Sequence, residues 1–351
     1  MHQRGETFRY LAGEDVRAAM KQVDVVQVVE EAFRAHARGR TVLPEEAYLG
    51  WTTEAGHAAR CLAMPGAIEV DGARAVGLKT INASLGNTAA GLSRSQGFTL
   101  LLDPESARPS VLMEAAYVSA MRTAAATAVA ALRLGAAPPA ALGLIGCGVL
   151  GEAHVRLLAD PRAGSTSVVL FDLVPGRAEA LARALRADLP GLRIRVAGSA
   201  RECVGAASLL VTATTVTEGY IPAEWLADGA MVAHVSLDDL CPDAVLAADL
   251  VVVDDWGLVS QDPRRLLGRM YRSGQLLGPD GCRHPDAVER PDARRVDAGL
   301  GEICLDDRAR PVEKGVKIVF NPFGMAVLDV AVAEHVRRAA QSLGLGSELP
   351  L

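Results

Sequence analysis

The sequence predicts an α/β protein in which a doubly wound parallel sheet is combined with an α+β domain built from both chain ends. Two patterns predict this. Between residues 129 and 316, short apolar segments alternate with helical ones, which is typical of a parallel sheet covered on both faces. Outside that range, short apolar runs separated by glycine and polar clusters indicate strands of a second sheet. We therefore expect one domain at 129–316 and another made of 1–128 and 317–351.

Hydrophobic periodicity and turn residues predict the elements of the discontinuous domain. Apolar residues in 15–40 recur at the i, i+3, i+4 spacing of an amphipathic helix. Apolar runs between 60 and 102 predict strands, and the turn residues Asp103 and Pro104 lead into the next strand as an antiparallel neighbour. An alanine-rich helix is expected at 114–135, before the central domain.

In the central domain, three glycines with the spacing G-x-G-x-x-G end an apolar strand and open a helix. Such a loop can seat a pyrophosphate on the helix N-terminus. About twenty residues on, Asp172 ends a second apolar strand, where a carboxylate can accept a hydrogen bond from a ribose hydroxyl. The pattern predicts a Rossmann-type NAD site. NADP is the alternative cofactor, because Arg177 is either a ligand of its 2′-phosphate or a solvated side chain. The expected cofactor-binding residues of the loop and first helical turn are Gly146, Gly148, Val149, Leu150 and Gly151.

Composition argues against several other classes of protein. The chain has 351 residues, a formal net charge of −6 and no dense Lys/Arg tract, so no nucleic-acid partner is expected. We recognise no apolar stretch of about 20 residues and no signal-peptide pattern, which predicts a cytoplasmic protein with no membrane partner. The six cysteines form no C-x-x-C pair, so reduced thiols are expected. Cys282 with His284 is too small a set for a metal site.

Three segments resemble the ornithine cyclodeaminase/mu-crystallin family of NAD(P)-dependent proteins. They are GLKTIN at 77–82, EAAYVSAMRTAAATAVAA at 114–131 and NPFGMAVLDVA at 321–331. Together with the domain order, the resemblance covers most of the chain. It implies a homodimeric, two-domain oxidoreductase that acts on a small amino-acid-like substrate.

Two cations are the main candidates for substrate binding. Lys79 interrupts an apolar strand, and its ammonium needs either a substrate carboxylate or carbonyl, or water reached by the end of the side chain. Arg122 can hold a carboxylate with two hydrogen bonds, or pair with Glu114. The resemblance implies substrate contacts for both residues and a part in catalysis for Lys79. Thr123, next to Arg122, is expected to face the cofactor.

A pair of aspartates is the candidate for proton transfer. Asp238 and Asp239 follow an apolar strand, at the end where ligands bind in a doubly wound sheet. The resemblance implies one catalytic aspartate here. We favour Asp239 as general base and expect the other to cap a helix.

The remaining candidates lie near these residues. Arg94 is a second carboxylate clamp or a solvated loop residue. Glu46 stands where many relatives carry a substrate-binding arginine, and its charge opposes a substrate carboxylate. Asp329 caps or pairs within a helix, and the proline-rich stretch 261–296 is a solvated insertion or a lid. The residues expected on the nicotinamide side are Thr212, Ala213, Thr214 and Gly324.

Two segments, SLDDL at 236–240 and NPFGMAVLD at 321–329, look most like the branch that oxidises N-(2-amino-2-carboxyethyl)-L-glutamate in siderophore and antibiotic pathways. The implied products are 2,3-diaminopropionate and 2-oxoglutarate. Ornithine or lysine cyclodeaminase, imine or ketimine reductase and amino-acid dehydrogenase activities stay open. A non-catalytic, mu-crystallin-like NADP-binding protein is the alternative of another class, and the retained Lys79, Arg122 and aspartate pair argue against it.

Overall fold

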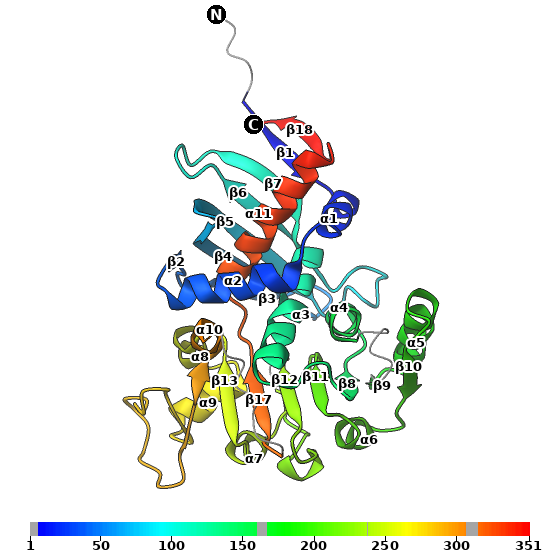
Figure 1. Ribbon diagram of the computed structural model, residues 1–351, viewed down its shortest axis with the longest axis vertical. Coiled ribbons are helices and arrows are strands. Elements are labelled where there is room, and N and C mark those ends of the chain that lie inside the picture. Colours follow the sequence, from blue (N-terminus) through cyan, green and yellow to red (C-terminus); the bar gives the residue numbers. More distant parts are fainter. Residues whose placement is uncertain (1–5, 160–166, 237, 307–314) are drawn as a thin grey trace, which may run out of the picture. The chain divides into compact units, whose positions relative to one another are not determined.

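The computed structural model describes residues 6–159, 167–236, 238–306 and 315–351. Two compact units are present (Figure 1): Met1–Arg122 with Met325–Leu351, and Thr123–Gly324. The alanine-rich helix was predicted at 114–135. It is α3 (Ala115–Arg133), whose first part belongs to the first unit and whose remainder belongs to the second.

The first unit is built on an eight-stranded mixed sheet that combines both chain ends, as predicted. The strand order is β18-β1-β7-β6-β5-β4-β2, and β3 pairs with β4. Strands β4 to β7 form the predicted antiparallel meander, whereas β1 runs parallel to β7. The strands are β1 (Thr7–Leu11), β2 (Thr41–Val42), β3 (Ala47–Thr52), β4 (Ala58–Val70), β5 (Ala73–Ser84), β6 (Ser95–Leu102), β7 (Pro109–Glu114) and β18 (Ser347–Pro350).

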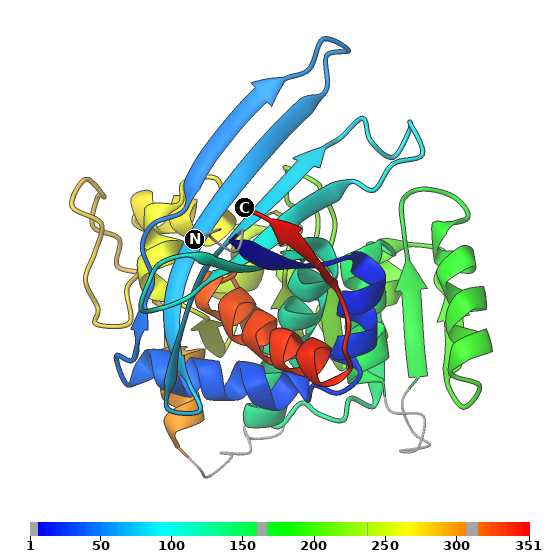
Figure 2. The same cartoon turned by 90° about the horizontal axis from the view of Figure 1, so that it is seen from above.

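Helices cover one face of this sheet, which we call the helix face; it is the face of β4 that carries Leu62, Met64 and Gly66. Helix α11 (Ala326–Ser342) packs on β4, β5 and β6 and also contacts α1 (Gly13–Met20) and α2 (Val25–Ala37) (Figure 2). A Cβ at Gly66 would lie 3.2 Å from Val327 and 3.3 Å from Ala326, so glycine allows the helix to approach the strand closely.

The second unit contains an eight-stranded sheet in which every pairing is parallel. Its order is β10-β9-β8-β11-β12-β17-β13-β16. Chain order reverses between β8 and β11, the position at which doubly wound sheets bind ligands beyond the carboxyl ends of the strands. The strands are β8 (Ala141–Ile145), β9 (Ser167–Phe171), β10 (Arg193–Val196), β11 (Leu209–Thr212), β12 (Met231–His234), β13 (Leu250–Val253), β16 (Ala298–Gly299) and β17 (Ile318–Asn321).

Short helices connect these strands. Helix α4 contacts β8 and β11, α5 contacts β9 and β10, and α6 contacts β8 and β9. The helices are α4 (Val149–Leu158), α5 (Arg177–Asp188), α6 (Ala200–Gly205), α7 (Pro242–Leu246), α8 (Trp256–Gln261), α9 (Leu266–Arg272) and α10 (Leu300–Leu305).

Two details differ from the prediction. A single 3₁₀ turn, η2 (Ala223–Trp225), stands where a helix was expected between β11 and β12. Strand β17 lies between β12 and β13 in the parallel sheet, so residues 317–324 belong to the second unit and not to the discontinuous one. All four residues of β17 are buried, as is typical of a central strand with both faces covered.

The stretch 261–296 is not the wholly irregular segment that its prolines suggested. It contains α9 and a pair of two-residue strands, β14 (Leu276–Leu277) and β15 (Arg294–Arg295). Leu266, Leu267, Met270 and Leu276 are buried in the core of the second unit, which anchors the first half of the stretch.

Helix α3 corrects the statement that no apolar stretch is long enough to cross a membrane. By length and composition alone it qualifies, but 72% of its apolar window is buried inside the protein. Such burial is typical of a core helix.

Candidate functional site

The glycine loop of the second unit needs each of its three glycines for a different reason. Gly146 has φ +96°, and a Cβ there would lie 2.6 Å from the carbonyl oxygen of Ala213. A Cβ at Gly151 would lie 2.2 Å from the carbonyl oxygen of Gly146. Gly148, the N-cap of α4, has no atom within 4 Å of its Cβ position. The loop therefore turns tightly, packs its helix closely and leaves open space at the helix N-terminus, so it fits a bound pyrophosphate.

Asp172 braces this loop. Its Oδ2 accepts the Cys147 N–H at 2.8 Å, and its Oδ1 accepts the Val174 N–H at 2.8 Å. A carboxylate can accept about four hydrogen bonds, so Asp172 can still accept one from a ribose hydroxyl. Arg177 is exposed at the start of α5.

A buried histidine holds α4 in place. The Nδ1 of His154 lies 2.7 Å from the carbonyl oxygen of Leu150, and its Nε2 lies 3.0 Å from the hydroxyl of Thr127 on α3. Burial lowers the pKa of His154 to about 4, so the ring is neutral at pH 7. It then donates from Nδ1 to the carbonyl and accepts from the threonine at Nε2.

Beyond the carboxyl ends of β11 and β12, three hydroxyls converge on Asp239. Thr214 donates to its Oδ1 at 2.8 Å and Tyr220 donates to the same oxygen at 2.7 Å, while Ser236 donates to Oδ2. Burial raises the pKa of Asp239, although the hydrogen bonds from Tyr220 and Thr214 oppose that rise. The result is a buried carboxyl group that keeps its proton to a higher pH than an ordinary aspartate.

His234 and Asn321 support this network from behind. The Nε2 of His234 accepts the backbone N–H of Asp239 at 3.1 Å. The amide nitrogen of Asn321 lies 3.0 Å from Nδ1 of His234 and donates to its carbonyl oxygen at 2.9 Å. Burial, together with the charges of Arg265 and Arg269, lowers the pKa of His234 to about 3. His234 therefore adds no positive charge next to Asp239.

The two neighbouring aspartates have different surroundings. Asp238 is 4% exposed and forms an ion pair with Arg269 on α9. Asp239 is wholly buried among neutral hydroxyls. Because Asp238 is already engaged in an ion pair, these contacts favour Asp239 over Asp238 for proton transfer.

Sequence reasoning missed an aspartate that shapes the 321–324 segment. Asp254 accepts the N–H groups of Phe323 at 2.8 Å and Gly324 at 2.6 Å. Arg265 donates to the carbonyl oxygens of Pro322 at 3.2 Å and Phe323 at 2.9 Å, and its guanidinium stacks 4.4 Å from the Phe323 ring centroid. The sequence did contain a feature that could have pointed to Asp254: it follows an apolar strand, just as Asp172 does.

Thr212 and Thr123, which were expected to face the cofactor, are both buried. The hydroxyl of Thr212 lies 3.0 Å from that of Ser236, so Thr212 belongs to the hydrogen-bond network of Asp239. Ala213 contacts the glycine loop through its carbonyl oxygen, as described above.

In the first unit, Asp329 joins the two predicted substrate-binding cations. The Lys79 Nζ donates to Asp329 Oδ2 at 2.8 Å and to the Ser119 hydroxyl at 3.3 Å. Arg122 donates from Nε to Asp329 Oδ1 at 3.1 Å. Lys79 is 1% exposed and Asp329 is 0% exposed. Two buried cations thus share one buried carboxylate, and the excess positive charge favours a bound anion.

This cluster corrects three expectations. The Lys79 ammonium does not extend into water, because its side chain is buried. Arg122 pairs with Asp329 and not with Glu114, whose carboxylate accepts the N–H groups of Ala116 at 2.6 Å and Tyr117 at 3.1 Å at the start of α3. Asp329 does more than cap or pair within its own helix, since it connects α11 to β5 and α3.

Glu46 acts on the same cluster. It precedes Ala47, which pairs with Ala63 on β4, and the next residue on β4, Met64, pairs with Lys79. Burial and, next, the charge of Arg122 lower the pKa of Lys79 to about 8, although Asp329 and Glu46 oppose the shift. Lys79 is therefore mostly charged at pH 7 and loses its charge within the range accessible to activity measurements.

The pKa of Lys79 predicts that substrate affinity depends on pH and has an alkaline limb, that is, a fall at alkaline pH. We expect the apparent affinity for a carboxylate substrate to fall as pH rises through about 8, because the ammonium becomes neutral. In Lys79→Arg the limb should move to higher pH, since a guanidinium stays charged. Initial rates between pH 6.5 and 9.5 measure KM in both proteins. An identical limb in both contradicts the assignment to Lys79.

Arg94 lies just before β6 and is half-buried. Its Nε is buried and has no hydrogen-bond partner. Burial and the nearby charge of Arg60, which sequence reasoning did not single out, lower the pKa of Arg94.

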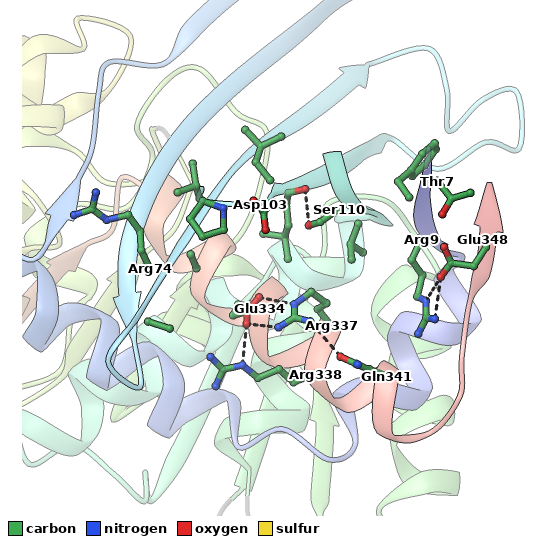
Figure 3. A pocket seen from close by; sticks show the side chains of 18 residues that line it. Thr7, Arg9, Arg74, Asp103, Ser110, Glu334, Arg337, Arg338, Gln341 and Glu348 are labelled. Atoms are coloured by element: carbon green, nitrogen blue, oxygen red, sulfur yellow. Dashed lines mark hydrogen bonds and ion pairs between the residues drawn. The ribbon is translucent and has the colours of Figure 1, made fainter. Parts of the chain in front are cut away.

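A cavity of about 500 Å³ lies elsewhere in the first unit (Figure 3). Several of its charged side chains are already paired, among them Arg337 with Glu334 at 2.7 Å and Arg9 with Glu348 at 2.9 Å. Lys79 and Arg122 do not line it. We therefore do not regard it as the functional site. Within the described ranges, no group of three or more His, Cys, Asp or Glu residues could hold a metal ion.

Comparison with known proteins identifies relatives over almost the whole chain. A model of the ornithine cyclodeaminase/mu-crystallin family matches residues 9–343. N-((2S)-2-amino-2-carboxyethyl)-L-glutamate dehydrogenase from Staphylococcus aureus is 29% identical over 334 residues, which is 93% of either chain.

Two solved structures share the fold and part of the sequence. The crystal structure of CmnK is 39% identical, with a TM-score of 0.87 and coverage of 99% of both chains. An archaeal alanine dehydrogenase dimer with bound NAD is 25% identical, with a TM-score of 0.80 and coverage of 99% of this chain and 100% of that chain.

Proposed function

This chain belongs to the ornithine cyclodeaminase/mu-crystallin family, and we propose that it is an NAD-dependent oxidoreductase that oxidises the Cα–N bond of an amino acid. The observation that carries the proposal is the buried pair of Lys79 and Arg122 sharing Asp329, which leaves charge for a substrate carboxylate. The glycine loop with Asp172 supports NAD. A carboxylate beside the ribose repels the 2′-phosphate of NADP.

The substrate that we propose is N-(2-amino-2-carboxyethyl)-L-glutamate, on the basis of the Staphylococcus aureus relative. Oxidation removes a hydride from the glutamate Cα and a proton from its nitrogen, and gives an imine. Water then adds to the imine carbon, and cleavage of the C–N bond releases 2,3-diaminopropionate and 2-oxoglutarate. The balance consumes one NAD and one water and yields one NADH and one proton.

Arg122 and Lys79 bind the substrate carboxylate and orient Cα, which is a proximity effect. When bound, the nicotinamide supplies the acceptor for the hydride. Asp239 takes a proton from the water that attacks the imine, and the hydroxyls of Tyr220 and Thr214 hold its carboxylate in position. The raised pKa of Asp239 makes its carboxylate a stronger base than that of an ordinary aspartate, which suits a group that accepts and returns a proton.

We propose that the protein is a homodimer that associates through the sheet face opposite the helix face. That face exposes Leu49, Trp51 and Phe98, which are 62%, 47% and 45% exposed. Exposed apolar side chains on one sheet face are typical of an interface. The archaeal alanine dehydrogenase is a dimer, which supports the dimeric state but does not bear on the face involved. Light scattering should give the mass of two chains for the wild type and of one chain for Phe98→Glu.

The test of the activity is turnover with NAD. The protein is incubated with NAD and, separately, with the glutamate conjugate, ornithine, lysine and alanine, and NADH absorbance is followed. We expect NADH and 2-oxoglutarate from the conjugate alone. Ornithine or lysine consumption without net NADH indicates a cyclodeaminase, which regenerates its cofactor and needs a product assay. NAD binding without turnover of any compound contradicts the proposed reaction and favours a binding protein.

A further inference from the structure

Two arginines of the first unit lie together without an acidic partner. Arg60 is on β4 and Arg94 immediately precedes β6. Across the residues that the structure describes, neither forms an ion pair with a carboxylate, and the Nε of Arg94 is buried without a hydrogen-bond partner. The repulsion from Arg60 is strong enough to lower the pKa of Arg94 in addition to the effect of burial. The folded chain therefore keeps two like charges together at a cost.

Strand register places Arg60 on the same sheet face as Lys79. On β4, Arg60 and Met64 are four residues apart and point to the same side; they pair with Ala83 and Lys79 on β5. Lys79 and Ala83 are thus separated by four residues, or about 13 Å along the strand. Because lysine and arginine have long side chains, their charged groups can lie closer together than these backbone positions.

The backbone around Arg94 is held in place. Its carbonyl oxygen accepts the Ser84 N–H at 3.2 Å and the Asn87 side-chain amide at 3.5 Å. The Asn87 amide also donates to the Ser93 carbonyl at 3.0 Å. The β3–β4 and β5–β6 hairpins extend past α2 and α11 (Figure 2). Arg94 is therefore set at a defined position near the end of the sheet strands.

We propose that Arg60 and Arg94 form a second carboxylate subsite, which binds a substrate carboxylate other than the one held by Lys79 and Arg122. A carboxylate supplies the missing acceptor for the Arg94 Nε–H and neutralises the repulsion between the guanidiniums. The inference rests on the proposed function and deepens it: the enzyme selects amino acids that carry at least two carboxylates. A substrate with one carboxylate leaves this pair unneutralised and is rejected.

Binding measurements test the subsite without relying on turnover. Calorimetry in the presence of NAD compares 2-oxoglutarate with 2-oxopentanoate, which has the same five-carbon chain but lacks the second carboxylate. We expect wild type to bind 2-oxoglutarate more tightly, and Arg60→Gln and Arg94→Gln each to weaken it tenfold or more with little effect on 2-oxopentanoate. Arg74→Gln, an exposed arginine on β5, is the matched control and should change neither affinity.

Thermal unfolding separates a binding role from a structural one. Because the arginines repel each other, the Tm of the free Arg94→Gln protein should be unchanged or raised. A lowered Tm together with equally weakened binding of 2-oxoglutarate and 2-oxopentanoate contradicts the subsite. An unchanged preference for 2-oxoglutarate in the Arg60→Gln, Arg94→Gln double variant also contradicts it. Equally strong binding of sulfate that depends on the two arginines contradicts it as well, because it indicates a general anion site.

The two proposals fail in different ways. Arginine-dependent binding of 2-oxoglutarate without turnover of any amino acid contradicts the proposed reaction and leaves the subsite standing. Turnover of the glutamate conjugate with unchanged KM in both arginine variants contradicts the subsite and leaves the reaction standing.

Discussion

Asp239→Asn is expected to lower kcat by about 10²- to 10⁴-fold, the usual contribution of a positioned general base. The asparagine oxygen can still accept the hydrogen bonds from Thr214 and Tyr220. The Ser236 hydroxyl can turn to accept from the new amide. The shape of the site is then kept, but the side chain cannot take a proton from water. The steady-state rate of NADH formation with the glutamate conjugate measures the loss.

The pH profile distinguishes proton transfer from a structural effect. Because the pKa of Asp239 is raised, its carboxyl stays protonated to a higher pH than an ordinary aspartate, and a protonated carboxyl cannot act as base. Activity of the wild type should therefore fall as pH decreases through that raised pKa. The residual activity of Asp239→Asn should lack this acid limb.

Asp238→Asn is the matched control. Asp238 is paired with Arg269, so its replacement should leave kcat within a few-fold of wild type and keep the acid limb. NAD affinity, measured by fluorescence, should be unchanged in both variants. If Asp238→Asn causes the larger loss, the assignment of the two aspartates is reversed.

Local patterns were sufficient to predict the nucleotide loop and the sheet that carries it. The three glycines, the apolar strand before them and the helix after them follow one another in the sequence, so the loop could be predicted without knowing that Gly146 also packs against Ala213 after β11. The alternation of strands and helices in the second unit is also a local property, read from apolar runs and turns. Here sequence and structure agree.

The substrate-binding cluster depends on contacts that no local pattern contains. Lys79 and Asp329 are 250 positions apart, and Arg122 and Asp329 are 207 apart. Periodicity placed Asp329 on a helix but could not say which element that helix would face. The same limit explains β17: its buried, apolar sequence predicts a strand, whereas its position between β12 and β13 is decided by the whole sheet.

Long-range partners also separated residues that look alike in sequence. Asp238 and Asp239 were ambiguous by one position. They are distinguished by the ion pair of Asp238 with Arg269, 31 residues away, and by the hydroxyls that donate to Asp239. Arg60 belongs to no sequence motif. It became a candidate because strand register places it on the same sheet face as Lys79 and because Arg94 is nearby, and both facts are known only from the folded sheet.

Asp329→Asn is expected to be the most destabilising substitution in the first unit. It removes the carboxylate that Lys79 and Arg122 share while both stay buried, and breaking a buried ion cluster by removing one partner typically costs about 3–5 kcal/mol. The pKa of Lys79 should fall below about 8, because Asp329 is one of the groups that oppose its lowering. Urea unfolding at pH 7 gives the change in free energy of unfolding.

Two further variants show whether charge is the cause. Glu348→Gln removes a carboxylate from the exposed Arg9 pair in the same unit and should cost less than about 1 kcal/mol. Lys79→Met should recover part of the stability lost in Asp329→Asn, because one of the two unpaired cations is then replaced by an apolar side chain. In a double-mutant cycle the combined cost is therefore smaller than the sum of the single costs. Additive costs indicate that Asp329 stabilises the fold through packing alone, and Lys79 and Arg122 then need no shared carboxylate to stay buried.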